Sequence, residues 1–178
     1  MLDTGARFLE ARPRSVAEVR RKLTRLGYRA ELVAAAVERL AELGFLDDEA
    51  FTRAWIESRD RARPRGEHAL RRELGLKGVD RALVDAVLEE RRDDAGVAAA
   101  SWDEVPASPD EAAAERLLRK KLRPILREPD ARKRGQRAYA LLARNGFAPG
   151  VCSSVSRKVL ADLAADAQED DVPVPEEA

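Results

Sequence analysis

Apolar residues recur along the chain at the spacing of amphipathic α-helices. In residues 16–26 they return every three or four positions, with arginines and lysines largely on the other side, and residues 32–43 carry a wider apolar face. Ser15 and Glu18 have the spacing of a capping box, in which each side chain bonds the backbone amide of the other residue. Gly27 suits the left-handed conformation that often follows a helix end. The pattern predicts two helices that are divided at Gly27.

This helix–glycine–helix pattern occurs three times. A shift of 51 residues places Gly27 on Gly78, and a further shift of 68 residues places Gly78 on Gly146. The third copy is the most diverged. Such self-similarity is typical of helical-repeat proteins, in which each unit has a small core and shares apolar surface with its neighbours.

A further helix is predicted before each pair, over residues 4–11, 47–63 and 110–127. The last of these contains Pro124, where the helix should kink or stop because proline lacks a backbone N–H. We therefore expect an all-α protein made of three tandem three-helix repeats.

Composition divides the chain around these helices. We expect the first repeat in residues 1–44, the second in 45–92 and the third in 111–165. Residues 93–110 combine glycine, prolines and acidic residues, which is typical of a linker, and residues 166–178 form an acidic tail that we expect to be disordered.

Two adjacent carboxylates stand where the second repeat begins, in the segment GFLDDEAF (44–51). Adjacent acids can serve acid–base chemistry or bind a metal, but helix capping also explains them. With Asp47 as the N-cap, Leu46 and Phe51 have the spacing of a hydrophobic staple. Asp48 then lies in the first turn, where a negative charge stabilises a helix by about 0.3–1 kcal/mol. We expect a joint between two repeats here and no active site.

Residues that usually carry catalysis or bind metals are scarce. His68 is the only histidine and Cys152 the only cysteine, so neither a zinc site nor an intramolecular disulfide can be assembled. Cys152 falls on the apolar face of the last helix, which predicts a buried, inert thiol. The sequence also lacks a phosphate-binding glycine loop and a Ser–His–Asp arrangement. We expect a protein that is not an enzyme and uses no cofactor and no metal.

The longest apolar run, Leu32 to Val37, is too short to cross a bilayer, and the first residues have no signal-peptide pattern. A single cysteine fits a reducing compartment. We therefore expect a soluble, cytoplasmic protein.

Charge is distributed unevenly along the chain, although 33 basic and 33 acidic residues balance overall. Residues 116–144 contain 11 lysines and arginines against two acids, whereas residues 93–115 and 162–178 each contain seven acids and no base. Surface ion pairs and solubility explain part of this pattern. The basic block in addition favours contact with a polyanion or with an acidic protein surface.

Four segments together resemble one known family. They are RPRSVAEVRRKLTRLGY, LAELGFLDDEAFTRAWIESR, RPRGEHALRRELGLKGVDRALVDAVL and ALLARNGFAPGVCSSV, and they cover most of residues 6–160. In this order they are similar to the RecX family, bacterial regulators of the RecA recombinase. Residues 102–109 and the tail after residue 162 match no pattern of that family.

The resemblance implies tandem three-helix repeats in an elongated, curved molecule. It also implies that the partner is RecA, bound in the groove of the RecA filament on single-stranded DNA. Inhibition of strand exchange, ATP hydrolysis and coprotease activity would follow, with a role in homologous recombination, DNA repair and the SOS response. Members of the family are not enzymes, and we expect a monomer.

Basic residues on the predicted helix faces are the candidate contacts with RecA or with DNA phosphate. Arginine is well suited to this because its guanidinium group matches phosphate and carboxylate geometry. The candidates are Arg20, Arg21, Arg25, Arg53, Arg59, Arg71, Arg72, Arg119, Lys120, Arg132, Lys133 and Arg137.

The alternative function is a transcription regulator that binds duplex DNA. Helix pairs broken at Gly27 or Gly78 also resemble helix-turn-helix units. The second helix of the first pair reads AELVAAAVERL, however, and offers few polar groups that could reach base edges. This composition argues against the alternative.

Overall fold

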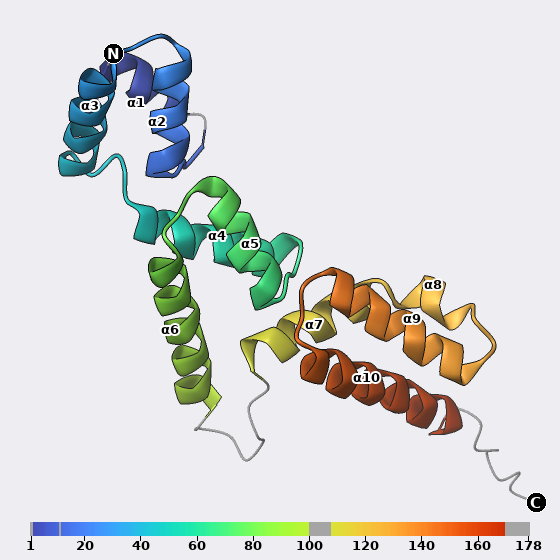
Figure 1. Cartoon of the computed structure of the whole chain (residues 1–178). Helices are drawn as coiled ribbons and strands as arrows, with labels where there is room; N and C mark the ends of the chain where they lie inside the picture. The colour runs from blue at the N-terminus through green and yellow to red at the C-terminus, as the bar shows by residue number, and fades with distance from the viewer. Residues whose placement is uncertain (1, 11, 100–107, 170–178) are drawn as a thin grey trace, which may run out of the picture. The chain divides into compact units, whose positions relative to one another are not determined.

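The computed structural model describes residues 2–10, 12–99 and 108–169 (Figure 1). All regular elements within these residues are α-helices, which confirms the predicted all-α class. The helices are α1 (Leu2–Glu10), α2 (Val16–Arg25), α3 (Ala30–Glu42), α4 (Asp48–Ala62), α5 (Glu67–Lys77), α6 (Arg81–Ala99), α7 (Pro109–Lys120), α8 (Leu122–Leu126), α9 (Ala131–Arg144) and α10 (Pro149–Glu169).

Three groups of helices correspond to the predicted repeats: α1–α3, α4–α6 and α7–α10. Each group surrounds its own apolar core. Leu23 and Leu40 are central to the first core, Leu70 and Leu74 to the second, and a core around Leu142 fills the third. The tandem three-helix repeats are thereby confirmed, while the elongated, curved outline stays a prediction.

The described residues fall into two compact units. Unit 1 contains residues 2–62 and 70–99, and unit 2 contains residues 63–69 and 108–169. The loop before α5 and its first turn therefore pack with the third group of helices. The residue boundaries that we expect between repeats remain a prediction.

Local sequence signals start and stop these helices as expected. The Ser15 hydroxyl accepts from the Glu18 amide at 3.2 Å, and the Glu18 carboxylate accepts from the Ser15 amide at 3.3 Å, which completes the capping box of α2. Gly27 follows this helix with φ of 84°. Asp47 caps α4, since its carboxylate accepts from the amides of Glu49 and Ala50 at 2.8 and 3.0 Å.

Pro124 breaks its helix at the predicted place. The helix α7 ends at Lys120, and α8 begins at Leu122. Lys120 is four residues before Pro124. In a continuous helix the amide of residue 124 would donate to the Lys120 carbonyl, but proline has no amide hydrogen and its ring clashes with that carbonyl.

Two helices are longer than the sequence suggested. The helix α6 continues to Ala99, inside the segment 93–110 that we expected as a linker, and α10 continues to Glu169, inside the tail 166–178. The extension of α6 contains three alanines, and Gly96 alone does not end a helix that its neighbours favour. Residues 100–107 and 170–178, the rest of these two segments, lie outside the described residues.

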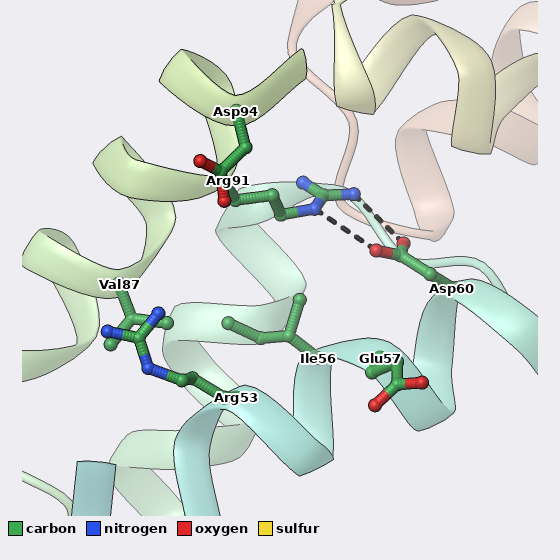
Figure 2. Close-up of a pocket in the computed structure, with 7 residues that line it drawn as sticks. All are labelled: Arg53, Ile56, Glu57, Asp60, Val87, Arg91 and Asp94. Carbon is green, nitrogen blue, oxygen red and sulfur yellow. Dashed lines mark hydrogen bonds and ion pairs between the residues drawn. The ribbon is translucent and has the colours of Figure 1, made fainter. Parts of the chain in front are cut away.

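An ion pair ties α4 to α6 within unit 1 (Figure 2). The guanidinium group of Arg91 donates to both carboxylate oxygens of Asp60, at 3.0 and 2.9 Å. This two-pronged geometry is the strongest form of a side-chain ion pair. It holds α4 and α6 together beside the apolar contact of Ile56 with Val87, both buried.

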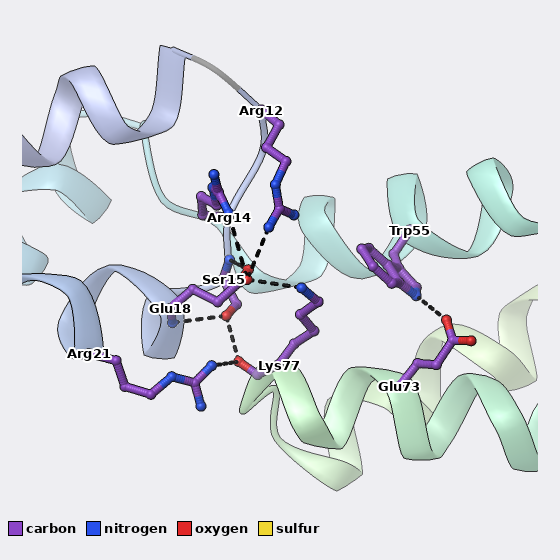
Figure 3. Close-up of polar contacts among 8 residues, drawn as sticks. All are labelled: Arg12, Arg14, Ser15, Glu18, Arg21, Trp55, Glu73 and Lys77. Atoms are coloured by element: carbon purple, nitrogen blue, oxygen red, sulfur yellow. Dashed lines mark hydrogen bonds and ion pairs between the residues drawn. The ribbon is translucent and has the colours of Figure 1, made fainter.

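The start of α2 is bonded to the second repeat (Figure 3). The buried Ser15 hydroxyl donates to the backbone carbonyl of Lys77 at 2.7 Å. The Val16 amide donates to the Asp48 carboxylate at 2.9 Å. The Glu18 carboxylate in turn accepts from the Lys77 ammonium group at 2.9 Å. We call this set of contacts the α2 joint. It gives Asp48 a role beyond the helix-start charge that the sequence suggested.

The same contacts recur at the start of α5, within unit 2. The Gly66 amide donates to the backbone carbonyl of Asn145 at 3.1 Å, and the Glu67 amide donates to the Asp110 carboxylate at 3.1 Å. Gly66 and Glu67 align with Ser15 and Val16 under the 51-residue shift. In both joints, two groups of the following repeat accept hydrogen bonds from the start of a middle helix. One is an aspartate at the start of that repeat's first helix, and the other is a backbone carbonyl at the end of its middle helix.

The two carboxylates of the α2 joint respond oppositely to their surroundings. Burial alone would raise the pKa of Glu18, but the hydrogen bonds from Lys77 and from the Ser15 amide, with the charges of Lys77 and Arg12, together hold the pKa below its ordinary value. Burial, with the neighbouring charge of Asp47, raises the pKa of Asp48 although the bond from the Val16 amide opposes the rise. The ionised Glu18 carboxylate therefore stabilises the folded state, and this stabilisation is lost as pH falls through its lowered pKa. For Asp48, folding favours the protonated carboxyl group, because its pKa is higher in the folded state.

The α2 joint predicts unequal effects of two glycine substitutions. Gly27 and Gly78 have φ of 84° and 82°, so alanine at either position has a backbone strain of about 1–2 kcal/mol. A Cβ at position 78 would in addition collide with the Cβ of Ala17, whereas a Cβ at position 27 would meet nothing within 4 Å. We expect Gly78→Ala to lower the free energy of unfolding by about 1–3 kcal/mol more than Gly27→Ala.

Urea denaturation followed by circular dichroism measures both variants. Equal losses of stability in the two variants would contradict the close packing of α2 on the end of α5.

Candidate basic interaction surfaces

Five of the twelve predicted basic residues are held in ion pairs, so contact with a partner through them must compete with an existing interaction. All five are within reach of a carboxylate from their own unit. The pairs are Arg53 with Glu49 and Glu90, Arg59 with Glu73, Arg71 with Asp85, Arg119 with Glu115 and Asp162, and Arg137 with Glu128.

Arg59 has a structural role beside Trp55. Its guanidinium carbon lies 4.3 Å from the centre of the Trp55 ring, and the Lys77 ammonium nitrogen lies 4.9 Å from it. The indole N–H donates to Glu73 at 3.1 Å, and the same carboxylate oxygen accepts from Arg59 at 2.7 Å. Trp55 therefore anchors a network of charges in unit 1, and these contacts leave little room for a nucleic-acid base to stack on its ring.

The remaining predicted residues are exposed. Arg21 donates to the backbone carbonyl of Lys77 at 3.3 Å. Within the described residues, the other six have no carboxylate partner, so their charge is available to a ligand. They are Arg20, Arg25, Arg72, Lys120, Arg132 and Lys133.

One pocket in unit 1 gathers three arginines, from α5 and from the first turn of α6. The side chains of Arg71, Arg72 and Arg81 line it together with Gly75, Val79 and Val84, and its volume is about 290 Å³. We call it the α5–α6 pocket. Its apolar floor and arginine rim suit an anionic group that is attached to an apolar one.

A single carboxylate restrains two arginines of the α5–α6 pocket. Asp85 accepts from the Arg71 Nε at 2.6 Å and lies 3.6 Å from the Arg81 Nε. The hydrogen bond from Arg71 is the main reason that the pKa of Asp85 lies below its ordinary value, with the charge of Arg81 adding to it. Arg72 is exposed and has no carboxylate partner within the described residues, so the pocket keeps an excess of positive charge.

Arg81 was not among the predicted residues. It follows Asp80, whose carboxylate caps α6 by accepting from the amides of Ala82 and Leu83 at 2.8 and 3.3 Å. Arg71 and Arg81 approach the same carboxylate, that of Asp85, only because of how α5 and α6 fold together.

A second basic surface runs along α9 in unit 2. Lys133, Arg137, Ala140 and Arg144 recur every three or four residues on one exposed face, and with Glu128 and Gln136 they line a groove of about 340 Å³. The opposite face of the helix buries Ala138 and Leu142 in the core. We call this surface the α9 groove. Arg144 was missed in the sequence, although it ends the basic block 116–144.

Another pocket, between α4 and α6, has charges of both signs, with one acid more than its two arginines. It is lined by Arg53 and Arg91 against Glu57, Asp60 and Asp94 around the apolar side chains of Ile56 and Val87, as Figure 2 shows. A surface with charges of both signs gives no preference for a polyanion. The two basic surfaces are therefore the better candidates for binding.

Two further searches cover only the described part of the chain. No helix there has both the length and the apolar character needed to cross a membrane. No group of three or more histidine, cysteine or acidic side chains in the same residues could hold a metal ion.

Tandem three-helix repeats place this chain among the helical-repeat proteins. Comparison with known proteins gives the family. Residues 2–40 match the model for the first three-helix domain of RecX, and residues 47–88 match the model for the second.

Whole-length relatives agree with these domain matches. The regulatory protein RecX of Mycobacterium avium (strain 104) is 35% identical over 161 residues, which cover 90% of this chain and 83% of that protein. That of Thermobifida fusca (strain YX) is 31% identical over 171 residues, or 96% of this chain and 83% of that protein. The chain belongs to the RecX family of regulatory proteins, as its sequence segments indicated.

A solved structure shares the fold. The crystal structure of RecX from Lactobacillus salivarius superposes with a TM-score of 0.71 over 88% of this chain and 92% of that one, at 15% sequence identity. The likeness at this low identity shows that the helical-repeat fold is common to both chains.

The α5–α6 pocket predicts how Asp85 titrates. Arg71→Ala removes the hydrogen bond that lowers the pKa of Asp85, so this pKa should rise toward the ordinary aspartate value of 3.8. Arg72→Ala removes the same charge from the neighbouring residue without breaking a contact to Asp85. Carboxyl-detected NMR titration measures both variants, and equal shifts of the Asp85 pKa would contradict the described pairing.

Proposed function

We propose that this protein binds the RecA filament on single-stranded DNA and lowers its recombinase, ATPase and coprotease activities in the cytoplasm. Membership of the RecX family is the observation that carries this proposal. The basic surfaces add a physical means of attachment, because both an acidic protein surface and DNA phosphate attract exposed guanidinium groups.

Unpaired cations are the side chains that favour binding most. A cation already in an ion pair must give up that contact, whereas an exposed cation without a partner loses only its hydration. Arg72 in the α5–α6 pocket and Lys133 in the α9 groove meet this condition. Once one such contact has formed, the contacts on the other repeats face their sites at a high effective concentration. Several weak contacts, one on each repeat, can then give tight binding together.

Nucleic acid and RecA are both chemically suited to these surfaces. The residues that we propose to contact one or the other are the exposed, unpaired members of the predicted set together with Arg81 and Arg144. Residues such as Arg59 and Arg119, which hold helices together by ion pairs, are less suited to contact a partner.

Duplex DNA recognition is the less favoured alternative. The exposed positions of α3 include Glu31, Glu38 and Glu42 but only one basic residue, Arg39. A helix in the major groove lies between two rows of phosphates, where this excess of acid is repelled. The second helix of the first pair is therefore a poor recognition helix.

A charge reversal in the α5–α6 pocket tests the proposed attachment. Arg72→Glu replaces an exposed cation with an anion beside Arg71 and Arg81, and it breaks no contact. We expect it to weaken binding to preassembled RecA–DNA filaments by about fivefold or more at low ionic strength. Co-sedimentation of the labelled protein with filaments measures this affinity.

Arg39→Glu is the matched control. It makes the same change of charge in the same unit, on a helix that presents no basic surface, and its exposed pair with Glu42 contributes little stability. Equal affinities of the Arg72 and Arg39 variants would remove the α5–α6 pocket from the interface.

A further inference from the structure

Two arginines of the α5–α6 pocket are only weakly held by other side chains of unit 1. Arg72 is exposed and has no carboxylate partner within the described residues. The Arg81 Nε lies 3.6 Å from the Asp85 carboxylate, which already accepts from Arg71 at 2.6 Å, and the Arg81 side chain is 90% exposed. Arg72 belongs to α5 and Arg81 begins α6, yet both line this pocket. An anion between them gains two guanidinium partners and breaks no close ion pair.

The pocket is open between these arginines because residue 75 has no side chain. Gly75 lines the pocket from inside α5, and a Cβ built there would meet no atom within 4 Å. Glycine inside a helix costs about 0.5–1 kcal/mol relative to alanine. Gly75 does not have a positive φ and crowds no neighbour, so neither the backbone nor the packing requires a glycine at this position.

The first and third repeats lack this combination. Under the shifts of 51 and 68 residues that align the repeats, Gly75 corresponds to a threonine and an alanine, and Arg81 to an alanine and a proline. These residues are Thr24, Ala143, Ala30 and Pro149. The open floor and the second arginine therefore do not follow from the architecture that the three repeats share.

Charge selects the class of anion that suits the pocket. A phosphate monoester carries a charge of about −1.5 to −2 at pH 7 and three acceptor oxygens, so two guanidinium groups can hold it at once. A carboxylate, or the phosphodiester of a nucleic-acid strand, carries a single negative charge and gains less from a second cation.

Size and polarity select the rest of the ligand. The pocket volume of about 290 Å³ lies at the small end of ligand pockets. Gly75, Val79 and Val84 line it without a polar side chain. A small apolar or aromatic group attached to the phosphate suits this part of the pocket.

We propose that the α5–α6 pocket binds a small organic phosphate monoester. Arg72 and Arg81 hold the phosphate, and the organic group covers the floor at Gly75. An occupied pocket withholds both arginines from other anions, so the ligand competes with any macromolecule that uses them. The proposal requires neither RecA nor DNA as a partner.

Phenyl phosphate is the probe for this chemistry. It is titrated into the full-length chain near neutral pH, and NMR follows the side-chain N–H groups of the arginines. We expect saturable binding with a Kd on the order of 1 mM or tighter, with shifts at Arg72 and Arg81. Absence of saturable binding at several times that concentration overturns the proposal.

Three related probes separate the contributions of charge and ring. Methyl phenyl phosphate keeps the ring but has one negative charge, inorganic phosphate keeps the charge but has no ring, and phenylacetate replaces the phosphate with a carboxylate. Each should bind more weakly than phenyl phosphate by about threefold or more. Equal affinity for any of them overturns the proposal, and for phenylacetate it would indicate the carboxylates of a protein partner instead.

Filling the pocket tests the position of the organic group. Gly75→Leu keeps every arginine and introduces a side chain that favours helix. We expect it to weaken phenyl phosphate binding by about tenfold and inorganic phosphate binding much less, because only the ring needs this space. Gly135→Leu is the matched control inside α9, where a Cβ also meets no atom within 4 Å, and it should leave both affinities unchanged. Equal effects of the two variants would contradict the proposal.

Removing the charges tests the position of the phosphate. R72Q/R81Q should abolish saturable binding, whereas R29Q/R39Q removes two exposed charges from the same unit and should bind phenyl phosphate as the unchanged chain does. Equal losses in both double variants would show general attraction of anions and overturn the site. Because these measurements contain neither RecA nor DNA, their failure is distinct from a failure of the proposed RecA binding.

Discussion

The backbone amides at the start of a middle helix have no partner within that helix, and in this protein they are satisfied by the repeat that follows. The first turn of any α-helix leaves such amides free. At Val16 and at Glu67 an aspartate from the next first helix accepts the bond. The Lys77 carbonyl accepts from the Ser15 hydroxyl, and the Asn145 carbonyl accepts from the Gly66 amide. A three-helix repeat of about 45 residues buries little apolar surface by itself, so these joints let each repeat depend on its neighbour.

Contacts between helices account for part of the abundant charge of this protein. Glu18 binds Lys77, and Arg59 and Glu73 enclose Trp55, so these charges stabilise contacts between helices. Other cations, such as Arg72, are left exposed on the same scaffold. We infer that the first group maintains the relative positions of helices and that the second group is available to partners.

Much of this architecture is readable from the sequence because its signals are local. The capping box of Ser15 and Glu18, the left-handed Gly27 and the break before Pro124 depend on residues within four positions of one another, and these three were predicted. The bond from Val16 to Asp48 and the pairing of Arg71 with Asp85 join residues 14 or more positions apart. No periodic pattern encodes such contacts, so the sequence could list arginines but could not separate the paired ones from the free ones.

The central claim is that this helical-repeat protein restrains RecA. Its most direct measurement is the single-stranded-DNA-dependent ATPase rate of RecA, titrated with the full-length protein. Our account predicts that the rate falls progressively and reaches a low plateau at or below one molecule per RecA protomer. An unchanged rate at stoichiometric amounts would contradict it.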